Sequence, residues 1–255
     1  MLETNMKREA LTKRKLYSLL AKLKTSPGDY ITLYAKPSSF PHYLDGLSLQ
    51  PKCRIYADEI KGSVKIKTVV QGAEKHNTGA AIYWPKNGNK YIVLPPFAIT
   101  EDKVSIGELD TSLLYEALEQ EYIMGVMLVT WGSYSIGVFD HDNLIELKTG
   151  TGHIHKEHRK GGRSEKRFAR RTEEQKKDFL RRVSNRIEER FKNYYLDYIF
   201  FGGNRLILKP LLKECKYLEL RVHRISGRIL DTRHADKEAL NCSLEEITKS
   251  LIFTF

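Results

Sequence analysis

The sequence predicts an α+β fold in two domains. Segments with the apolar spacing of strands alternate with segments that have the spacing of helices along the 255 residues, and this order is typical of sheets covered by helices. Two prolines, Pro95 and Pro96, and an acidic stretch over residues 100–110 interrupt the order, as expected of a linker. We therefore expect an N-terminal α/β domain over residues 1–105. A second domain over residues 106–255 should contain a mixed β-sheet packed by helices, one of them long and basic.

The elements expected in the first domain follow from leucine spacing, from β-branched and aromatic runs and from turn residues. They are a basic amphipathic helix over residues 1–25 and strands over residues 30–34, 64–70, 80–84 and 91–94. The last two strands flank the turn sequence PKNGNK, in which Asn87-Gly88 tolerates the positive φ angles of a tight turn. We therefore expect these two strands to form a β-hairpin.

A long helix between two groups of strands is expected in the second domain. The elements are a helix over residues 111–121, strands over 125–131, 133–139 and 144–149, the long helix over 172–193, a strand over 198–201, a helix over 206–215, a strand over 217–225 and a final helix over 244–251. Thr172 is the expected N-cap of the long helix, and Glu173 and Glu174 complement the dipole in its first turn. Gly202 and Gly203 follow a strand without a complete phosphate-binding motif, so they predict a tight strand-to-helix turn.

Bulk composition limits the classes of protein to which the chain can belong. A hydrophobic content of 41% and a charged content of 29% exclude a collagen-like or fully disordered chain, and no apolar run approaches the roughly 20 residues that span a bilayer. The N-terminus lacks the apolar core of a signal peptide. The three cysteines are widely spaced and odd in number, as in reduced cytosolic proteins. We therefore expect a cytoplasmic protein without a membrane partner.

Positive charge is concentrated in one segment. The chain has a net charge of +11, and residues 155–192 hold 15 Lys or Arg against 7 Asp or Glu. Residues 159–171 read RKGGRSEKRFARR, with Glu165 as the sole acid. A face that serves solubility mixes the two signs, and paired glycines let a ligand approach backbone amides. The segment therefore predicts contacts with a polyanion, nucleic acid first. With few apolar anchors, residues 152–170 are expected to be a poorly ordered loop without RNA.

This segment resembles the Gly-Gly-Gln loop and following helix in the central domain of archaeal and eukaryotic class I peptide-chain release factors. The matching residues are Gly161, Gly162, Ser164, Arg167, Phe168 and Arg170. A strand pair precedes the loop, an apolar strand ending in Gly-Gly follows the helix, and LAKLKTSPGDYITLYAKP resembles the opening of such factors. The chain is most similar to the Vms-like release-factor group, which includes the ankyrin-and-zinc-finger peptidyl-tRNA hydrolases. It lacks the stop-codon-reading NIKS signature, and the GTPase-contacting C-terminal domain would begin about where this chain stops.

The resemblance implies a release-factor central-domain-like fold for the second domain. It also implies hydrolysis of the ester bond of peptidyl-tRNA in ribosome rescue or quality control, without codon recognition and without a cofactor. The implied partners are the large ribosomal subunit, its ribosomal RNA and the acceptor end of peptidyl-tRNA. Residues implied to lie at the ester are Gly161, Gly162, Arg163 and Ser164. Residues implied to contact RNA are His155, Arg159, Lys160, Lys166, Arg167, Arg170 and Arg171.

One substitution bears on this chemistry. Arg163 stands where release factors have the glutamine that helps to orient a water molecule, and the shifted glutamine of Vms-like members would fall near Ser164 or Glu165. Arginine stays protonated, so it donates hydrogen bonds to a developing oxyanion but is a poor general base. Two functions therefore remain open. One is a peptidyl-tRNA hydrolase, and the other is a ribosome- or RNA-binding module of the same fold that has lost hydrolysis.

Two other groups of residues have competing interpretations. The spacing of His153, His155 and His158 is similar to that of a metal-binding stretch in metallo-β-lactamase-type hydrolases. The surrounding arginines and lysines oppose a dication, so we expect no metal, and a metallohydrolase is the third alternative. Tyr194 and Tyr195 precede an aromatic strand; we interpret them as core or interface residues rather than as a platform on which bases stack.

Overall fold

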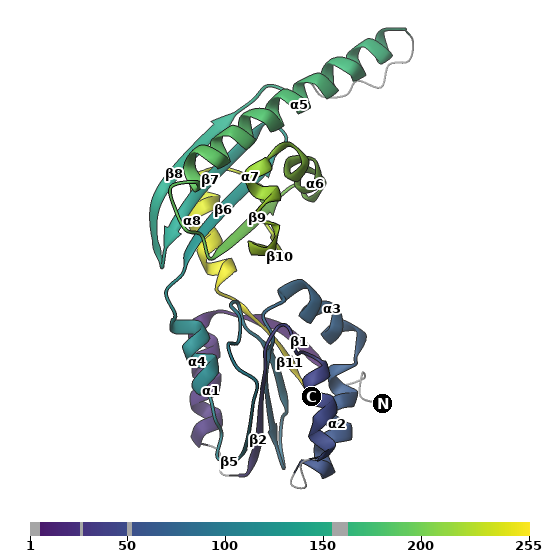
Figure 1. Ribbon diagram of the computed structural model, residues 1–255, viewed down its shortest axis with the longest axis vertical. Helices are drawn as coiled ribbons and strands as arrows, with labels where there is room; N and C mark the ends of the chain where they lie inside the picture. The colour runs from purple at the N-terminus through teal and green to yellow at the C-terminus, as the bar shows by residue number, and fades with distance from the viewer. Residues whose placement is uncertain (1–5, 26–27, 50–52, 155–162) are drawn as a thin grey trace. The chain divides into compact units, whose positions relative to one another are not determined.

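The chain folds around two β-sheets, which are shown in Figure 1. The computed structural model describes residues 6–25, 28–49, 53–154 and 163–255. The chain divides into two compact units, here named unit 1 (Met1–Gln120 with Glu245–Phe255) and unit 2 (Glu121–Leu244). Each unit contains one of the two sheets.

Unit 1 holds a sheet of six strands within the described residues, and all neighbouring strands are antiparallel. In spatial order they are β1 (Lys7–Leu11), β11 (Ser250–Thr254), β4 (Tyr91–Leu94), β3 (Ala80–Pro85), β2 (Tyr30–Ala35) and β5 (Lys103–Gly107). β1 and β11 lie far apart in the sequence, yet they pair with Ala10 opposite Leu251. The last strand of the chain therefore belongs to the first sheet.

Helices cover both faces of this sheet, because the side chains of each strand alternate between the faces. The described helices of unit 1 are α1 (Lys13–Thr25), α2 (Arg54–Val64), α3 (Lys67–His76), α4 (Ser112–Glu119) and the 3-10 helix η2 (His42–Leu49). Ile82 and Trp84 of β3 belong to a buried cluster with α2 and α3, whereas Ala81 and Tyr83 belong to a cluster with α1 and α4. Figure 1 shows the two pairs of helices on opposite sides of the sheet, which makes unit 1 a three-layer sandwich.

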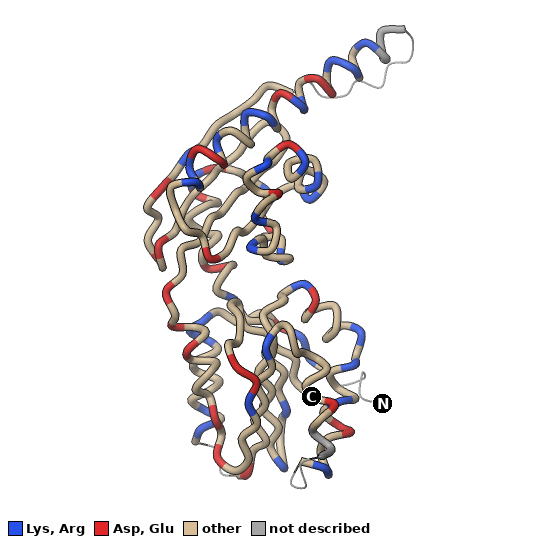
Figure 2. Tube along the Cα trace, in the orientation of Figure 1, with Lys and Arg blue, Asp and Glu red and all other residues tan. Residues whose placement is uncertain are grey.

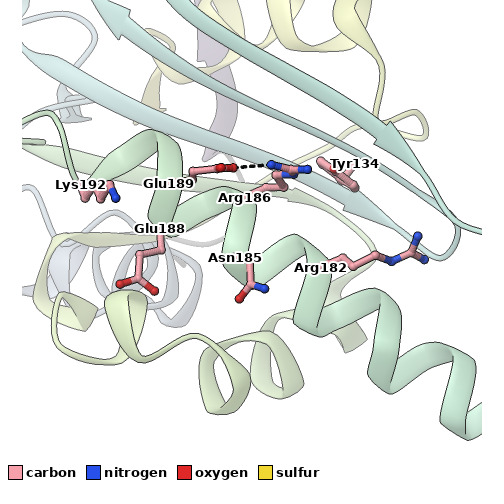
Figure 3. A pocket seen from close by; sticks show the side chains of 7 residues that line it. All are labelled: Tyr134, Arg182, Asn185, Arg186, Glu188, Glu189 and Lys192. Atoms are coloured by element: carbon pink, nitrogen blue, oxygen red, sulfur yellow. Dashed lines mark hydrogen bonds and ion pairs between the residues drawn. The ribbon is translucent and has the colours of Figure 1, made fainter.

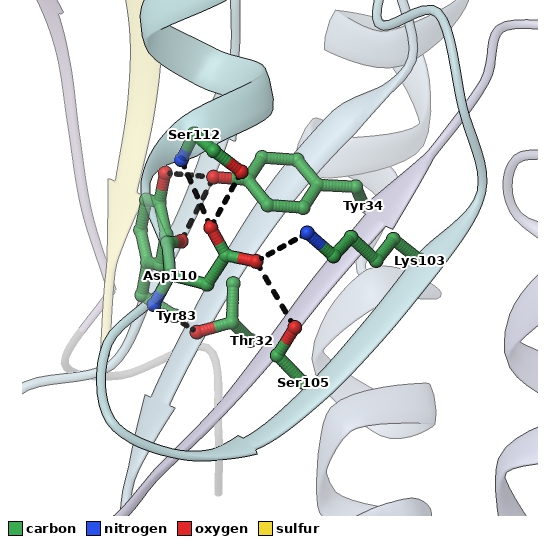
Figure 4. Close-up of polar contacts among 7 residues, drawn as sticks. All are labelled: Thr32, Tyr34, Tyr83, Lys103, Ser105, Asp110 and Ser112. Carbon is green, nitrogen blue, oxygen red and sulfur yellow. Dashed lines mark hydrogen bonds and ion pairs between the residues drawn. The ribbon is translucent and has the colours of Figure 1, made fainter.

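Asp110 links the edge strand β5 to α4 and to the neighbouring strand β2 (Figure 4). Its carboxylate accepts hydrogen bonds from the Ser105 hydroxyl (3.0 Å) and the Ser112 N–H (2.9 Å), and lies 2.8 Å from the Lys103 ammonium. The Tyr34 hydroxyl donates to the Asp110 carbonyl over 2.9 Å. Burial by itself would raise the pKa of Asp110, but the hydrogen bonds from Lys103 and the two serines outweigh it. They hold that pKa well below its usual range.

Unit 2 holds a mixed sheet of five strands within the described residues. In spatial order they are β10 (Ile225–Leu230), β9 (Tyr198–Gly203), β6 (Ile123–Thr130), β7 (Ser133–Asp140) and β8 (Asn143–Thr151). β10, β9 and β6 are parallel, whereas β6, β7 and β8 form an antiparallel meander. Parallel strands need crossover connections. The helices that precede β9 and β10 supply them.

The described helices of unit 2 are α5 (Arg163–Phe191), α6 (Arg205–Glu214), α7 (Lys216–Glu219), the 3-10 helix η3 (Val222–Arg224) and α8 (Lys237–Ile247), whose last residues belong to unit 1. α5, α6 and α7 share one buried cluster with one face of the sheet. On the opposite face, a Cβ atom at Gly137 of β7 would lie 2.6 Å from Leu240 of α8. The sheet of unit 2 is therefore covered on both faces.

The predicted α+β class is confirmed, as is a mixed sheet packed by a long basic helix. β3 and β4 form the expected antiparallel hairpin. Gly203, with φ of 97°, and Asn204, whose side chain accepts a hydrogen bond from the Leu206 N–H, form the expected tight turn into α6. The three cysteines form no disulfide. Among the described helices, none combines the length and the apolar character needed to cross a bilayer.

Two predictions in unit 1 are wrong because tertiary contacts decide the structure. Residues 64–70 were expected to be a strand, but they join α2 to α3. Ile66 and Val69 there, together with Ala73 in the next turn of α3, recur at helical spacing and pack in or against the buried cluster on the sheet. Residues 7–11, expected within a helix, form β1, because β11 supplies their hydrogen-bonding partners.

The C-terminal predictions differ from the structure for the same reason. Residues 217–225 form α7 and η3, and the strand begins only at Ile225. A helix was expected over residues 244–251, but α8 ends at Ile247 and β11 begins at Ser250. The residues of β11 alternate between the two buried clusters of unit 1. Since β5 and β11 both pair in the first sheet, the structural division falls after Gln120 and again near residue 245, rather than at residue 105.

Replacing Asp110 by alanine should destabilise unit 1 by about 2 kcal/mol at pH 7, because the part-buried Ser105 hydroxyl and the Ser112 N–H lose a charged acceptor. The folded-state pKa of Asp110 is depressed, so its contribution is present at neutral pH. That contribution is lost as pH falls below about 4, the ordinary aspartate pKa. The difference in the free energy of unfolding between wild type and Asp110→Ala should therefore become smaller at acidic pH.

The measurement is urea unfolding in a Trp131→Phe background, where Trp84 is the remaining tryptophan and reports unit 1. Asp58→Ala, which removes an exposed carboxylate from α2, is the control and should change little. If the difference in unfolding free energy between wild type and Asp110→Ala stayed constant down to pH 2, the predicted link between this stability and the ionisation of Asp110 would be contradicted.

Candidate functional site

The long helix α5 is the framework of the candidate site. Its 29 residues correspond to about 43 Å at 1.5 Å per residue. Its C-terminal half is anchored by Phe179, Val183, Ile187 and Phe191, all fully buried in the cluster against the sheet. The Phe179 ring lies 6.3 Å from that of Trp131 between centroids. This apolar stripe recurs every three to four residues, as helix geometry requires.

The strand that leads toward α5 is held against the same anchor. β8 ends at Thr151, and the next N–H, of Gly152, donates to the carbonyl of Gly132 over 2.8 Å. A Cβ atom at Gly152 would lie 2.7 Å from both Phe179 and Arg182 of α5. Only glycine permits so close an approach. The chain therefore leaves β8 directly beside the packed part of α5.

The N-terminal part of α5 is exposed and cationic. Every residue from Arg167 to Arg171 is exposed, including the Phe168 ring at 47%. Figure 1 shows this part continuing beyond the sheet, and Figure 2 shows its charges. Arg170 lies 3.1 Å from Glu174 one turn later, whereas Arg167 and Arg171 form no ion pair with any residue that the structure describes. These cations are therefore open to an external anion.

The predicted site residues divide into three groups. Gly161, Gly162, His155, Arg159 and Lys160 lie outside the described residues. Arg163, Ser164 and Lys166 belong to the first turns of α5. Arg167, Arg170 and Arg171 are exposed one or two turns later. The structure thus places the described members of the set at one end of one helix.

Two expectations about this segment are wrong. α5 begins at Arg163, so the expected loop over residues 152–170 is helical from residue 163 onward. Thr172, the expected N-cap, is buried within the helix instead. Glu173 and Glu174 pair with Lys176 and Arg170 across three- and four-residue spacings, which supports a helix through the position where the predicted start lay.

A shallow depression of about 570 Å³ lies beside the packed half of α5 (Figure 3). It is lined by Tyr134 of β7, by Lys192 just after α5 and by five α5 side chains, namely Arg182, Asn185, Arg186, Glu188 and Glu189. Arg186 and Glu189 form an ion pair of 2.6 Å inside it. Because the lining mixes both signs, it resembles a solvated helix face more than an anion site.

A second cationic cluster was missed in the sequence. Tyr195, expected to be a core or interface residue, is 74% exposed, and the guanidinium of Arg224 lies over its ring at 4.1 Å from the centroid. Arg221 lies over Tyr217 in the same way at 3.9 Å. The arginines follow the tyrosines by 29 and 4 residues. Of the two pairs, only the second has a local spacing that sequence inspection can detect.

The structure does not bring together a metal site in the parts of the chain that it describes. No group of three or more His, Cys, Asp or Glu side chains there is placed to hold an ion. Of the histidine cluster, only His153 is described, and it is exposed. His155 and His158 lie outside the described residues.

Truncating Phe179 should destabilise unit 2 by about 3–5 kcal/mol, because it leaves a cavity beneath Trp131 and Tyr134. The measurement is urea unfolding of Phe179→Ala in a Trp84→Phe background, where Trp131 reports unit 2. Phe168→Ala is the matched control, since its ring is half exposed on the same helix, and should lose less than 1 kcal/mol, roughly the effect of a surface change. If both variants lost the same amount of unfolding free energy, the proposed role of Phe179 in anchoring α5 would be refuted.

Solved structures similar to this chain include translation termination factors. An archaeal translation termination factor, aRF1, is 17% identical with a TM-score of 0.41, over 93% of this chain and 70% of its own. Pelota of Thermoplasma acidophilum is 14% identical with a TM-score of 0.28, over 94% of this chain and 63% of its own. Dom34 of S. cerevisiae, a translation termination-like factor, is 9% identical with a TM-score of 0.32, over 94% of this chain and 66% of its own. No curated protein matches the chain.

A family model gives the assignment. The model described as Actinobacteria/chloroflexi VLRF1 release factor matches residues 123–252. The match covers just over half of the chain and includes the whole sheet of unit 2, α5 and the basic segment. The resemblance to release factors in residues 159–171 is thereby confirmed, and the chain belongs to the Actinobacteria/chloroflexi VLRF1 release factor family.

Proposed function

We propose that this protein acts at the large ribosomal subunit in the cytoplasm as a peptidyl-tRNA hydrolase of release-factor type. In this role it releases stalled nascent chains without reading a codon. The observation that carries the proposal is the family match over residues 123–252, which contain both the basic segment and the helix that follows it. Ribosomal RNA and the acceptor end of peptidyl-tRNA are the proposed partners.

The charge of α5 supports a polyanionic partner. The N-terminal end of a helix carries a partial positive charge from its dipole and free N–H groups. Here Arg163, Lys166 and Arg167 add like charge to that end, which is unfavourable in the free protein. Phosphates bound there relieve the repulsion and pair with the guanidinium groups. The helix is thus best suited to a site rich in phosphate, such as ribosomal RNA.

The proposed chemistry is addition of water to the ester carbonyl carbon. The bond from that carbon to the tRNA ribose oxygen breaks, one water proton goes to this oxygen, and the peptide leaves as its acid. Gly161 and Gly162 are proposed to let their backbone approach the ester, and Arg163 to donate to the developing oxyanion. Ser164 is proposed to lie at the same site. Arg163 stays protonated and does not remove the water proton.

Peptide release from purified peptidyl-tRNA–ribosome complexes tests this proposal. Wild type should release the peptide, and Gly162→Ala with Arg163→Ala should slow single-turnover release roughly 100-fold, the effect of losing an oxyanion donor. Gly46→Ala with Arg54→Ala is the matched control, because Gly46 has open space for a methyl group and Arg54 is exposed in unit 1. No release by wild type, or full release by the loop variant, would overturn the catalytic role.

A second function is favoured by the arginine itself. Because Arg163 replaces the glutamine that helps to orient water, the chain is alternatively a binding module that has kept the fold and lost hydrolysis. Both functions require ribosome binding through Arg167, Arg170 and Arg171. Absence of release together with tight ribosome binding would favour the second function over the first.

Charge reversal of these three arginines to glutamate should abolish co-sedimentation with ribosomes. Wild-type binding should weaken steeply with salt, by a slope of about 0.7–0.9 per neutralised phosphate on logarithmic axes. Reversal of Lys65, Lys67 and Lys75, exposed on α3 and on the turn before it, changes the net charge equally and should preserve binding. If both triple variants lost binding alike, net charge rather than α5 would be responsible.

A further inference from the structure

The exposed tyrosine beyond the C-terminal end of α5 has one ring face occupied and the rest open. The Arg224 guanidinium lies 4.1 Å from the centroid of the Tyr195 ring, yet Tyr195 remains 74% exposed. Arg224 is fixed in this position, because it donates hydrogen bonds to the carbonyl of Leu196 and, over 3.4 Å, to the ring of His223. The pair is therefore a preorganised stack with one face of the tyrosine accessible to solvent.

A second arginine, Arg221, lies close to this stack, because the Arg224 N–H donates to the Arg221 carbonyl over 2.9 Å. Arg221 stacks on Tyr217 at 3.9 Å, and its side chain donates to the Tyr217 carbonyl over 3.4 Å. Neither Arg221 nor Arg224 forms an ion pair with a residue that the structure describes. Residues 216–228 contain four Lys or Arg and the single acid Glu219. Both guanidinium groups are partly exposed, and each retains N–H groups beyond those hydrogen bonds with which to bind an anion.

The Tyr217 hydroxyl donates to the carbonyl of Phe191, the last residue of α5, over 3.0 Å. The cluster is therefore tied to the C-terminal end of that helix. Arg167 lies 24 residues earlier, which is about 36 Å along the axis. The cluster is distinct from the basic end of α5 at which the proposed reaction takes place.

We infer that Tyr195 and Arg224 form a stacking site for an unpaired RNA base, and that Arg221 binds a phosphate next to it. An open tyrosine face accepts any base, and stacked arginine is a regular partner of single-stranded RNA. An acidic protein surface would bind the guanidinium edges but would leave the tyrosine face unused, so RNA fits the whole arrangement better. That the RNA is ribosomal rests on the proposed function; the stacking site itself does not.

Fluorescence anisotropy at low salt with two labelled 12-nucleotide strands tests the inference. One strand is oligoadenylate, and the other has the same ribose-phosphate backbone without bases. Wild type should bind oligoadenylate at least about 5-fold more tightly than the abasic strand, since one stacked base contributes roughly that factor or more. Tyr195→Ala should abolish this preference while retaining abasic binding, and Tyr195→Phe should keep it. Arg221→Ala should weaken binding of both strands.

Phe168→Ala is the matched control, because it removes another exposed ring from unit 2 and should leave the preference intact. Equal binding of both strands by wild type, or a preference that persists in Tyr195→Ala, would overturn the inference. Loss of the preference in Phe168→Ala alone would place base stacking on α5 instead. A protein partner would be favoured if an acidic peptide displaced labelled oligoadenylate more effectively than unlabelled RNA does, and if this displacement required Tyr195. That result would also overturn the inference. Since no ribosome is present, failure here is separate from failure of peptide release.

Discussion

The contact between the second half of α5 and the mixed sheet is the constraint on which unit 2 depends. Phe179, Val183, Ile187 and Phe191 bury one helical stripe against β6, β7 and β9. Burial of four large apolar side chains holds the helix in one position, and the described side chains from Arg167 to Asp178 form no comparable stripe. The helix is thus anchored at one end, and the arginines at its other end remain exposed.

The same contact fixes where the chain enters the basic segment. Gly152 is pressed against Phe179 and Arg182, so β8 and α5 converge on a common point of the core. Ile154, two residues later, is packed against the same cluster. A segment whose entry is tied to the core and whose exit is a long helix can carry a high density of like charge, because the apolar contacts that stabilise the fold lie elsewhere.

Unit 1 depends on contacts between distant parts of the sequence. β11 is inserted between β1 and β4, and Asp110 connects β5 to α4 and to the hydroxyl of Tyr34 through hydrogen bonds (Figure 4). Such connections have little local signature. A proline pair and an acidic stretch therefore resemble a linker in the sequence, although the acidic stretch contains β5, which forms the edge of the sheet.

Local spacing and charge are sufficient to predict the α+β class, the hairpin at Asn87-Gly88, the amphipathic stripe of α5 and the basic segment, because each depends on a few neighbouring residues. The resemblance at Gly161 and Gly162 also predicts the release-factor family, which the family model over residues 123–252 confirms. The start of α5 at Arg163 and the return of the C-terminal strand to the first sheet are seen only in the folded chain. Likewise, Tyr195 meets Arg224 only in the folded chain. Strand pairing and side-chain stacking between distant residues follow from the positions of the folded backbone, which no local pattern encodes.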